Sequence, residues 1–591
     1  MKTTCNFARL AVTAGLTAAM ALGNVVAPAA MAFADTSSTV TFEDADYAAS
    51  TTYKGIQIFK ATVATAADGT KTVSNIAWAS PDVEHAVVAA IQATDPEYAS
   101  NLAQDAADWL NANAGVSGTN SEVASGNVLS KIAANLNGKG TWKTTSAGGA
   151  SLSGLEAGYW LFLTASVGTP EGKSTDAFTS PVYAVIDGAT STTVTPKKGV
   201  PTVEKKILDD ADAAGVADIK GSKNWKDVAD SQIGQEVNYR LTGTIASNYA
   251  TFSTYAYKFT DVLSGGLDYV GGSVEVYALK DGAYTKIDAS KYDVAWDANT
   301  LTVEFKVGDG KMGLKDVEGV DANTQIVVFY RAKLNGNAVI GNAVDGNVGG
   351  NPNTVTLTYS NNPYAEGTGE TIEDTVADFA FKLNLNKVDQ GTEKGLAGAV
   401  FTIQSADANT KDLYVASKAD TTAGVVAGQF VTVADANNLP EYVKFTSDSD
   451  GKIAVSGLDA GSYKVTEVQT PDDTKYTKAS PFTLTISPTY DETAMKMTGL
   501  TAAVSDADKG RTDIAFGTLD GTAGDNKLTG TNGTGTNAAT GEVTINVGNT
   551  KSVGLPITGL DGVTLTWVAG GAVLVIGVAH LIRSRREESE E

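Results

Sequence analysis

Cysteine is almost absent from this chain of 591 residues: the single one, Cys5, lies near the N-terminus. Residues 1–34 carry Lys2 and Arg9, then an Ala-, Leu- and Val-rich run, and end in Ala32-Phe33-Ala34. This is the pattern of a secretory signal peptide with a small-x-small cleavage site. Its removal would leave a mature chain with neither disulfides nor a thiol nucleophile.

Histidine and positive charge are also scarce. The two histidines are His85 and His580, which excludes a Ser-His-Asp triad and a histidine zinc site, so we expect no metal, no cofactor and no enzyme. Lys and Arg total 44 against 68 Asp and Glu, for a formal net charge of −24. Because nucleic-acid phosphates need a basic partner, nucleic acid is excluded, and the charge suits a solvated surface protein.

Glycine, by contrast, is abundant (61 residues), and alternating Thr and Val runs are separated by Asp-Gly and Asn-Gly turns. This composition favours β-sandwiches, and the length exceeds what one hydrophobic core supports. We predict a mostly β chain of three tandem sandwich domains. The Ala-rich stretch Asp82–Ala114 has helical spacing and a break near Asp95-Pro96, so it predicts helices added to the first domain. The predicted domains are residues 35–196, 197–380 and 381–551.

The most hydrophobic segment of the chain, Val563–Ile582, lies near the C-terminus. As a helix of about 20 residues it matches the roughly 30 Å core of a bilayer. The basic cluster Arg583–Arg586 follows it directly, which is the pattern of a stop-transfer signal with the C-terminus inside the cell. We therefore predict a membrane-spanning precursor.

An LPITG pentapeptide precedes this span, held extended by its proline. Its residues are Leu555, Pro556, Ile557, Thr558 and Gly559. The order of signal peptide, ectodomain, LPITG, span and basic tail resembles the sorting signal of Gram-positive cell-wall proteins, here residues 552–591. The resemblance implies that a sortase cleaves the Thr558–Gly559 bond and transfers the new C-terminus to an amine.

The predicted third domain opens with a strand in which a lysine continues an apolar stripe. Side chains alternate along a strand, so Lys387 shares a face with Phe381, Leu383 and Leu385. This stretch resembles a collagen-adhesin B-type (CnaB) domain, together with Leu396–Ile403, Ser456–Pro471 and Glu542–Thr550. The resemblance implies a spontaneous isopeptide bond between Lys387 and Asn549, assisted by Glu467.

Elementary chemistry supports such a bond. A charged amine is costly to bury, so burial lowers the pKa of a lysine and leaves a neutral nucleophile. A buried carboxylic acid is pushed toward its protonated form and can pass a proton to departing ammonia. Folding holds amine and amide in contact, which supplies the effective concentration.

The predicted middle domain contains a second such lysine. In Val200–Leu208 the side chains of Val203, Lys205 and Ile207 share one face. Tyr257–Val270 and Asn351–Pro363 resemble the isopeptide-forming second domain of fimbrial shaft proteins, similar to the collagen-adhesin A type. The resemblance implies Asp261 as the assisting acid and Asn353, leading the last strand, as the amide; Asn342, Asn347 and Asn351 are alternatives.

The first domain contains an internal repeat of the third. SGLEAGYWLFLT, Ser153–Thr164, matches SGLDAGSYKVTE, Ser456–Glu467, but the position of Glu467 is occupied by Thr164. The closing strands of the first domain offer no asparagine. Tyr53–Ala61 resembles the opening of shaft-pilin N-terminal domains, and we expect a related sandwich without its own cross-link.

The linker Thr192–Thr202 carries adjacent lysines, Lys197 and Lys198. Val194-Thr195-Pro196-Lys197-Lys198 resembles the pilin motif of Gram-positive shafts, whose core reads VYPKN, with Thr195 in place of tyrosine and Lys198 in place of asparagine. The resemblance implies that the Lys197 amine attacks the sortase-bound end of another subunit, with Lys198 as the alternative acceptor.

These features together resemble a sortase-assembled shaft (backbone) pilin. The resemblance implies a surface pilus built as a covalent homopolymer, joined by sortase, anchored to peptidoglycan, accompanied by minor pilins and supporting adhesion. The alternative is a monomeric, sortase-anchored adhesin that binds host matrix or glycans. An adhesin has no need of a reactive lysine between domains, so Lys197 separates the two hypotheses.

Overall fold

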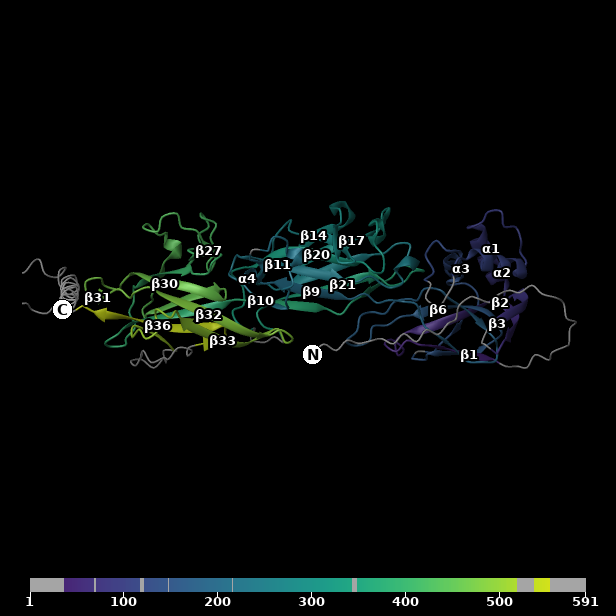
Figure 1. The fold of residues 1–591 in the computed structure, drawn as a ribbon, viewed down its shortest axis with the longest axis horizontal. Coiled ribbons are helices and arrows are strands. Elements are labelled where there is room, and N and C mark those ends of the chain that lie inside the picture. The colour runs from purple at the N-terminus through teal and green to yellow at the C-terminus, as the bar shows by residue number, and fades with distance from the viewer. Residues whose placement is uncertain are drawn as a thin grey trace, which may run out of the picture.

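The computed structural model describes residues 37–67, 71–116, 122–146, 148–214, 216–342, 348–517 and 536–552. Within them, three β-rich units follow one another along the long axis of the molecule (Figure 1). The predicted signal peptide, LPITG motif and membrane span lie outside these residues. No helix of the described part is long and apolar enough to cross a bilayer. The predicted mostly β fold is confirmed.

The first unit packs a central sheet between helices and a small second sheet. Strand β6 is apolar on both faces: Leu161 and Leu163 contact the helices, whereas Trp160 and Phe162 face the small sheet. The sheet orders are β3-β2-β6-β7 with β4 on β2, and β5-β1-β8. Its strands are β1 (Ser38–Phe42), β2 (Thr52–Thr65), β3 (Lys71–Trp78), β4 (Lys143–Thr144), β5 (Ser151–Leu155), β6 (Gly158–Ser166), β7 (Val182–Ile186) and β8 (Thr192–Val194).

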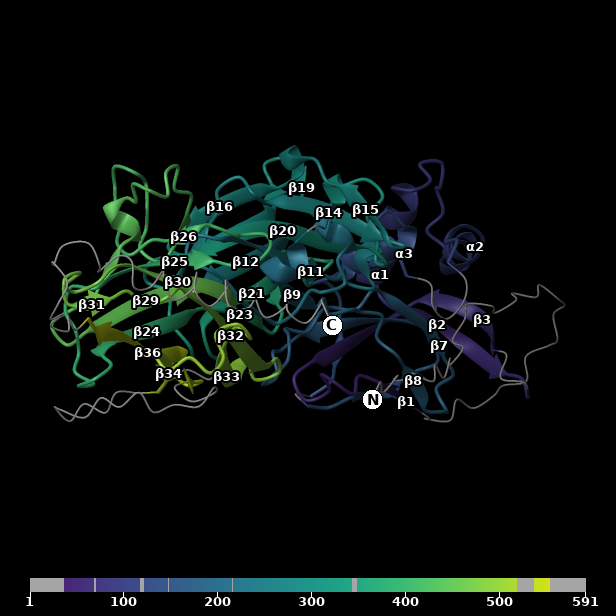
Figure 2. The same cartoon turned by 60° about the vertical axis from the view of Figure 1, so that its left-hand side comes forward.

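Among the described residues, the α-helices longer than four residues are three, and all belong to this unit; Figures 1 and 2 show where they lie on it. The predicted helical stretch forms α1 (Pro81–Gln92) and α2 (Ala103–Asn113), broken around Pro96 as expected. Ser80 caps α1 by accepting the N–H of Val83. The sequence analysis missed α3 (Val128–Leu136), whose buried apolar residues pack with those of α1.

The middle unit is a sandwich of two sheets over one large core. One sheet has the order β15-β14-β20-β11-β9 with β13 on β20, and the other β10-β23-β21-β12-β17-β16 with β22 on β21. Their strands are β9 (Val203–Leu208), β10 (Val228–Asp230), β11 (Glu236–Gly243), β12 (Tyr257–Leu263), β13 (Leu267–Tyr269), β14 (Glu275–Lys280), β15 (Ala283–Lys286), β16 (Asp293–Asp297), β17 (Thr300–Phe305), β20 (Gln325–Leu334), β21 (Asn351–Ser360), β22 (Thr368–Glu370) and β23 (Asp374–Phe379); β18 (Val307–Gly308) pairs with β19 (Lys311–Met312), and a short helix α4 (Asp210–Ala213) follows β9.

One expectation for this unit is wrong. Asn353 lies on β21, which is not the last strand, because β22 and β23 follow it. β23 pairs antiparallel with β21 and parallel with β10, and residue 380 alone separates it from the first strand of the third unit. The chain therefore leaves the middle unit through β23.

The third unit is also a two-sheet sandwich. Its sheet orders are β29-β24-β36-β31, with β34 and β35 on β36, and β27-β26-β25-β30-β32-β33, with β28 on β25. The first strand, β24, pairs in parallel with the last, β36. The strands are β24 (Phe381–Asp389), β25 (Val400–Ser405), β26 (Tyr414–Val415), β27 (Phe430–Val431), β28 (Phe445–Thr446), β29 (Lys452–Leu458), β30 (Gly461–Gln469), β31 (Tyr476–Thr477), β32 (Phe482–Asp491), β33 (Lys496–Val504), β34 (Ile514–Phe516), β35 (Thr536–Asn537) and β36 (Glu542–Lys551).

Hydrogen bonds join the third unit to the middle one. Ile233 donates its N–H to the carbonyl of Gly457 at 3.0 Å, and Asp230 accepts the N–H of Ala460 and the hydroxyl of Tyr490.

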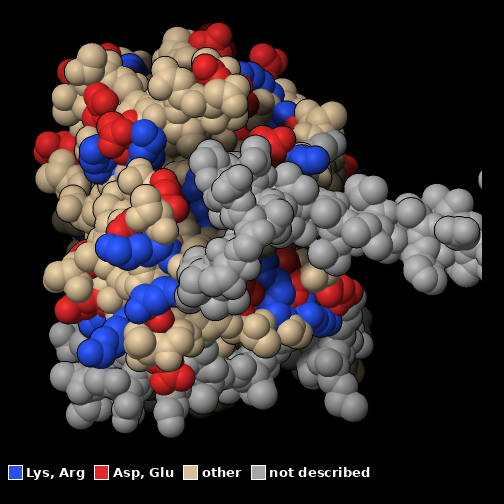
Figure 3. All heavy atoms as spheres, turned by 90° about the vertical axis from the view of Figure 1, so that its left-hand side faces the viewer, with Lys and Arg blue, Asp and Glu red and all other residues tan. Residues whose placement is uncertain are grey.

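The view from the C-terminal end shows acidic and basic side chains of the described residues mixed over that end of the molecule, without one large patch of either sign (Figure 3).

Candidate cross-linking sites

In the middle unit, Lys205, Asp261 and Asn353 come together in the core, each fully buried. Lys205 comes from β9 in one sheet, and Asp261 and Asn353 come from β12 and β21 in the other. Lys205 Nζ contacts Asp261 Oδ1 and donates to the hydroxyl of Tyr330 at 3.0 Å. Asn353 Nδ2 donates to the same hydroxyl at 2.6 Å, so amine and amide meet at one oxygen.

The surroundings favour a neutral amine. Burial lowers the pKa of Lys205 to about 8, although Asp261 opposes the shift. The rings of Tyr239 and Tyr330 stack with centroids 5.1 Å apart and wall the amine. Burial also raises the pKa of Tyr330 well above its usual value, so its hydroxyl keeps its proton. Tyr330 was not predicted as a site residue. In the sequence, Tyr330 alternates with Val328 and Ala332 along a strand, and this pattern could have placed it in the core.

The other asparagines of this region have different partners. Asn351 bonds backbone groups of Val339 through both ends of its amide and also donates to the carbonyl of Asp378. Asn342 bonds the backbone of Met497 in the third unit. Asn347 lies outside the described residues. Among the described candidates, Asn353 is the one whose amide shares a partner with Lys205.

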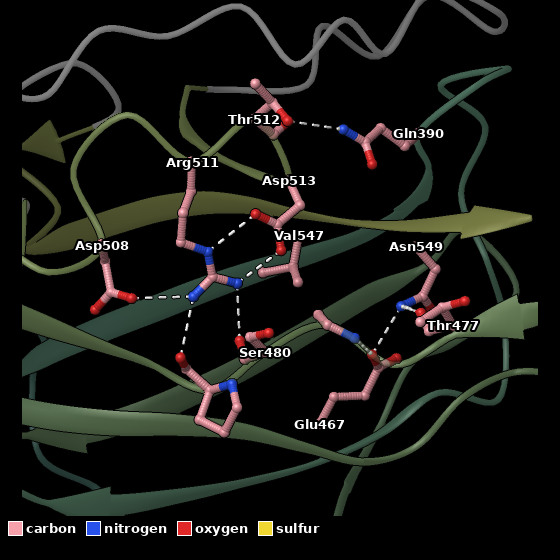
Figure 4. Close-up of polar contacts among 12 residues, drawn as sticks. Gln390, Glu467, Thr477, Ser480, Asp508, Arg511, Thr512, Asp513, Val547 and Asn549 are labelled. Carbon is pink, nitrogen blue, oxygen red and sulfur yellow. Dashed lines mark hydrogen bonds and ion pairs between the residues drawn. The ribbon is translucent and has the colours of Figure 1, made fainter. Parts of the chain in front are cut away.

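In the third unit, Lys387, Glu467 and Asn549 form a second buried cluster. Lys387 is on β24 and Asn549 on the parallel neighbour β36, whereas Glu467 reaches in from β30 of the opposite sheet. Lys387 Nζ lies 3.5 Å from Glu467 Oε1, and Asn549 Nδ2 donates to Glu467 Oε2 at 2.8 Å. Figure 4 shows Glu467 and Asn549 pointing toward each other. The carboxyl group therefore stands between the amine and the amide.

This second cluster repeats the electrostatics of the first. Burial lowers the pKa of Lys387 to about 8, with Glu467 as the main opposing influence. In both clusters, one carboxyl oxygen and the amide oxygen are buried without a hydrogen-bond partner among the described residues: Asp261 Oδ2 and Asn353 Oδ1, Glu467 Oε1 and Asn549 Oδ1.

The repeat position in the first unit holds no such cluster. Thr164 is buried on β6, and its Oγ1 accepts the N–H of Thr179 at 3.0 Å. Glu467 accepts the N–H of Ala479 at 2.6 Å in the same way. Thr164 thus satisfies a backbone donor as Glu467 does, without supplying a carboxyl group.

The two linker lysines are placed differently. Lys198 Nζ contacts Asp44 Oδ2 at 2.7 Å and also Asp176 Oδ2, and its side chain is 8% exposed. Lys197 is half-buried, and its backbone is held by Thr179 and Ser180. Burial lowers the pKa of the Lys197 amine, although Glu122 opposes the shift.

Two family models match the chain. Residues 233–363 match the Gram-positive pilin backbone subunit 2, Cna-B-like domain, and residues 381–500 match the SpaA prealbumin-like fold domain. The first match lies within the middle unit and the second within the third unit. The Cna-B-like description falls on the middle unit, for which the sequence suggested similarity to the A type.

The chain is also similar, at low sequence identity, to solved structures of backbone pilins. The T6 backbone pilin of serotype M6 Streptococcus pyogenes is 14% identical, with a TM-score of 0.46 over 88% of this chain and 98% of that chain. The major pilin SpaD from Corynebacterium diphtheriae is 17% identical, with a TM-score of 0.39 over 88% and 98%. BcpA, the major pilin subunit of Bacillus cereus, is 15% identical, with a TM-score of 0.37 over 88% and 99%. The search of curated proteins gave no significant match.

Proposed function

We propose that this protein is the shaft subunit of a covalently polymerised surface pilus. The observation that carries the proposal is the pair of buried lysine–acid–asparagine clusters, in two successive domains that match pilin families. The chain is secreted through its signal peptide, retained by its C-terminal span, cleaved by sortase between Thr558 and Gly559, and finally anchored to peptidoglycan. Minor pilins and a host matrix or glycan ligand complete the proposed partners.

Each cluster forms an isopeptide bond. The neutral lysine Nζ attacks the asparagine Cγ, the Cγ–Nδ2 bond breaks, and ammonia leaves with a proton that the acid transfers from Nζ. Nothing is oxidised or reduced. In the third unit, Glu467 contacts both nitrogens between which the proton moves. In the middle unit, Asp261 contacts the amine and Tyr330 bridges amine and amide.

The bonds lie on the mechanical path through a polymer. If Thr558 of one subunit is joined to Lys197 of the next, the load enters each subunit at Lys197 and leaves at Thr558. It then crosses the Lys205–Asn353 and Lys387–Asn549 bonds instead of the hydrogen-bond ladders between them. Residues 37–196 precede the entry point and therefore carry no load.

The contacts of the two linker lysines favour Lys197 as the acceptor. Attack on an acyl-enzyme needs an amine that the enzyme can reach. Lys198 is engaged by two carboxylates in a nearly closed site, whereas burial already lowers the pKa of Lys197. Sortase therefore joins the subunits at Lys197.

The test is a denaturing gel of muramidase-released wall material, boiled in SDS and blotted for this protein. Lys197→Arg keeps the charge but has no transferable amine, and Lys198→Arg is the matched control. We expect a high-mass ladder in the wild type and in Lys198→Arg, collapsing to monomer in Lys197→Arg. A ladder that survives Lys197→Arg moves the acceptor elsewhere. A single monomer band in the wild type, with its sortases expressed, favours the anchored adhesin.

A further inference from the structure

A third buried lysine site lies in the first unit and is unused by the proposed polymerisation. Lys198 Nζ contacts Asp44 Oδ2 at 2.7 Å and also Asp176 Oδ2. The side chains of Lys198 and Asp44 are each 8% exposed, and that of Asp176 is fully buried. The rings of Tyr47 and Tyr53 flank the amine, with centroids 5.1 and 5.8 Å from Nζ.

The site has the same chemical components as the two clusters described above. Each contains a buried amine, an acid in contact with it, a second carbonyl carbon and an aromatic wall. Here the second carbonyl belongs to an aspartate instead of an asparagine. Condensation of an amine with a carboxylic acid gives the same amide bond, with water as the leaving group in place of ammonia.

The topology also matches. In the third unit, the lysine and the asparagine stand on β24 and β36, which pair in parallel as the first and last strands. In the first unit, β1 and β8 also pair in parallel, with Phe42 opposite Val194. Asp44 follows β1 and Lys198 follows β8, so a bond between them would join the first and last strands of this unit too.

The contacts assign different roles to the two acids. Asp176 receives hydrogen bonds from the hydroxyl of Thr51 and the N–H of Ala177, and burial raises its pKa, which favours the neutral acid. Asp44 receives the hydroxyl of Tyr53 at 2.5 Å on the oxygen that faces Lys198. Asp176 thus corresponds to the assisting acid, and Asp44 supplies the carbonyl carbon.

We propose that Lys198 and Asp44 form an intramolecular isopeptide bond in the first unit, assisted by Asp176. Lys198 Nζ attacks Cγ of Asp44, a C–O bond of that carboxyl group breaks, and its oxygen leaves as water with protons that come from the amine and the acid. Asp176 carries the proton from Nζ to the departing hydroxyl. The sequence predicted no cross-link in this unit because its closing strands contain no asparagine. The proposal is independent of whether the protein polymerises.

The test is peptide mapping by mass spectrometry of the full-length chain, purified in detergent from cells that lack sortase. We expect a branched peptide that joins the segments containing Asp44 and Lys198, lighter than their sum by one water. Linear peptides carrying unmodified Asp44 and Lys198 would show that the cluster is an ordinary ion pair and overturn the proposal. A branch at Asp176 would overturn the assignment of Asp44.

Asp44→Asn keeps the test independent of misfolding. The product amide is identical to that of the wild type, so the branched peptide has the same mass, but the chain now loses ammonia instead of water. We expect this identical branch in Asp44→Asn and its loss in Lys198→Arg, which retains the positive charge. An Asp44→Asn chain without a branch, made beside a branched wild type, would contradict Asp44 as the acyl partner.

Discussion

The first and third units contain the same strand–turn–strand element, but only in the third does a buried lysine, Lys387, face the position of Glu467. Gly154 and Gly457 both have positive φ, +70° and +81°, and Gly158 and Gly461 have +149° and +134°, so the two turns have the same backbone shape. At the position where Glu467 faces Lys387, Thr164 keeps only the hydrogen bond to a backbone N–H. The carboxyl group is thus present where an amine needs a proton acceptor, and the fold itself does not require it.

The largest expected effect comes from making the third unit resemble the first. Glu467→Thr removes the acid between Lys387 and Asn549, so we expect the bond not to form and the mature chain to be heavier by one ammonia. Loss of closure of a loop of about 160 residues lowers the free energy of unfolding by on the order of 5 kcal/mol. Intact mass and denaturant unfolding measure the two effects.

Thr164→Glu is the reciprocal control. It adds a carboxyl group to the first unit, where Thr164 makes its hydrogen bond to the backbone of Thr179. We expect the mass of Thr164→Glu to differ from that of the wild type only by the substitution itself, with no additional ammonia lost. If the Glu467→Thr chain still loses the ammonia, the bond forms without the acid. The difference between threonine and glutamate at this position would then not explain why one unit is cross-linked there.

A smaller effect is expected from the two neighbouring asparagines of the middle unit. Asn353→Ala removes the amide that meets Lys205 at Tyr330, so one ammonia fewer is lost than in the wild type. Asn351→Ala removes three hydrogen bonds to backbone groups, which costs about 1 kcal/mol for each bond, but leaves the number of ammonia molecules lost unchanged. Intact mass, compared with the mass calculated from each variant's sequence, separates the two variants. Loss of one ammonia fewer in Asn351→Ala instead would make Asn351 the partner of Lys205.

The sequence predicted the fold class and the two core-facing lysines for physical reasons. Period-two alternation assigned Lys205 and Lys387 to core-facing positions, because a strand places alternate side chains on one face. The resemblance supplied the acids and the asparagines, which lie far away in the sequence. The order of the strands after Asn353 was not predicted, since β22 and β23 are short and lack an alternating pattern.

Contacts that depend on distant segments were beyond the sequence. The Asp44–Lys198–Asp176 cluster joins three loops without a shared motif, and nothing in the sequence indicates that they meet. The joint between the middle and third units is a similar case. Asp459 looks like an ordinary turn residue, equivalent to Glu156 in the first unit, yet Glu156 is exposed and Asp459 is buried against the middle unit.

The smallest expected effect concerns this joint and its pH dependence. Burial, followed by the nearby Asp230, raises the pKa of Asp459 well above its usual value, and burial together with Asp230 raises the pKa of Asp209 to about 7. Because the folded state holds protons that the unfolded chain releases, the contribution of these two groups to stability is greatest at acidic pH and falls as the pH rises from about 4 toward 7. Lys226 is a cation near Asp209, but its amine forms an ion pair with Asp212 instead.

Asp459→Asn keeps the shape of the side chain and removes its titration. We expect it to stabilise the protein at pH ~8 by on the order of 1 kcal/mol and to flatten the pH dependence of thermal unfolding. Glu156→Gln is the matched control at the equivalent position of the exposed turn, where no change is expected. If both variants change the pH dependence of thermal unfolding equally, burial of Asp459 at the joint does not contribute to that dependence, because Glu156 stands at the equivalent position of an exposed turn.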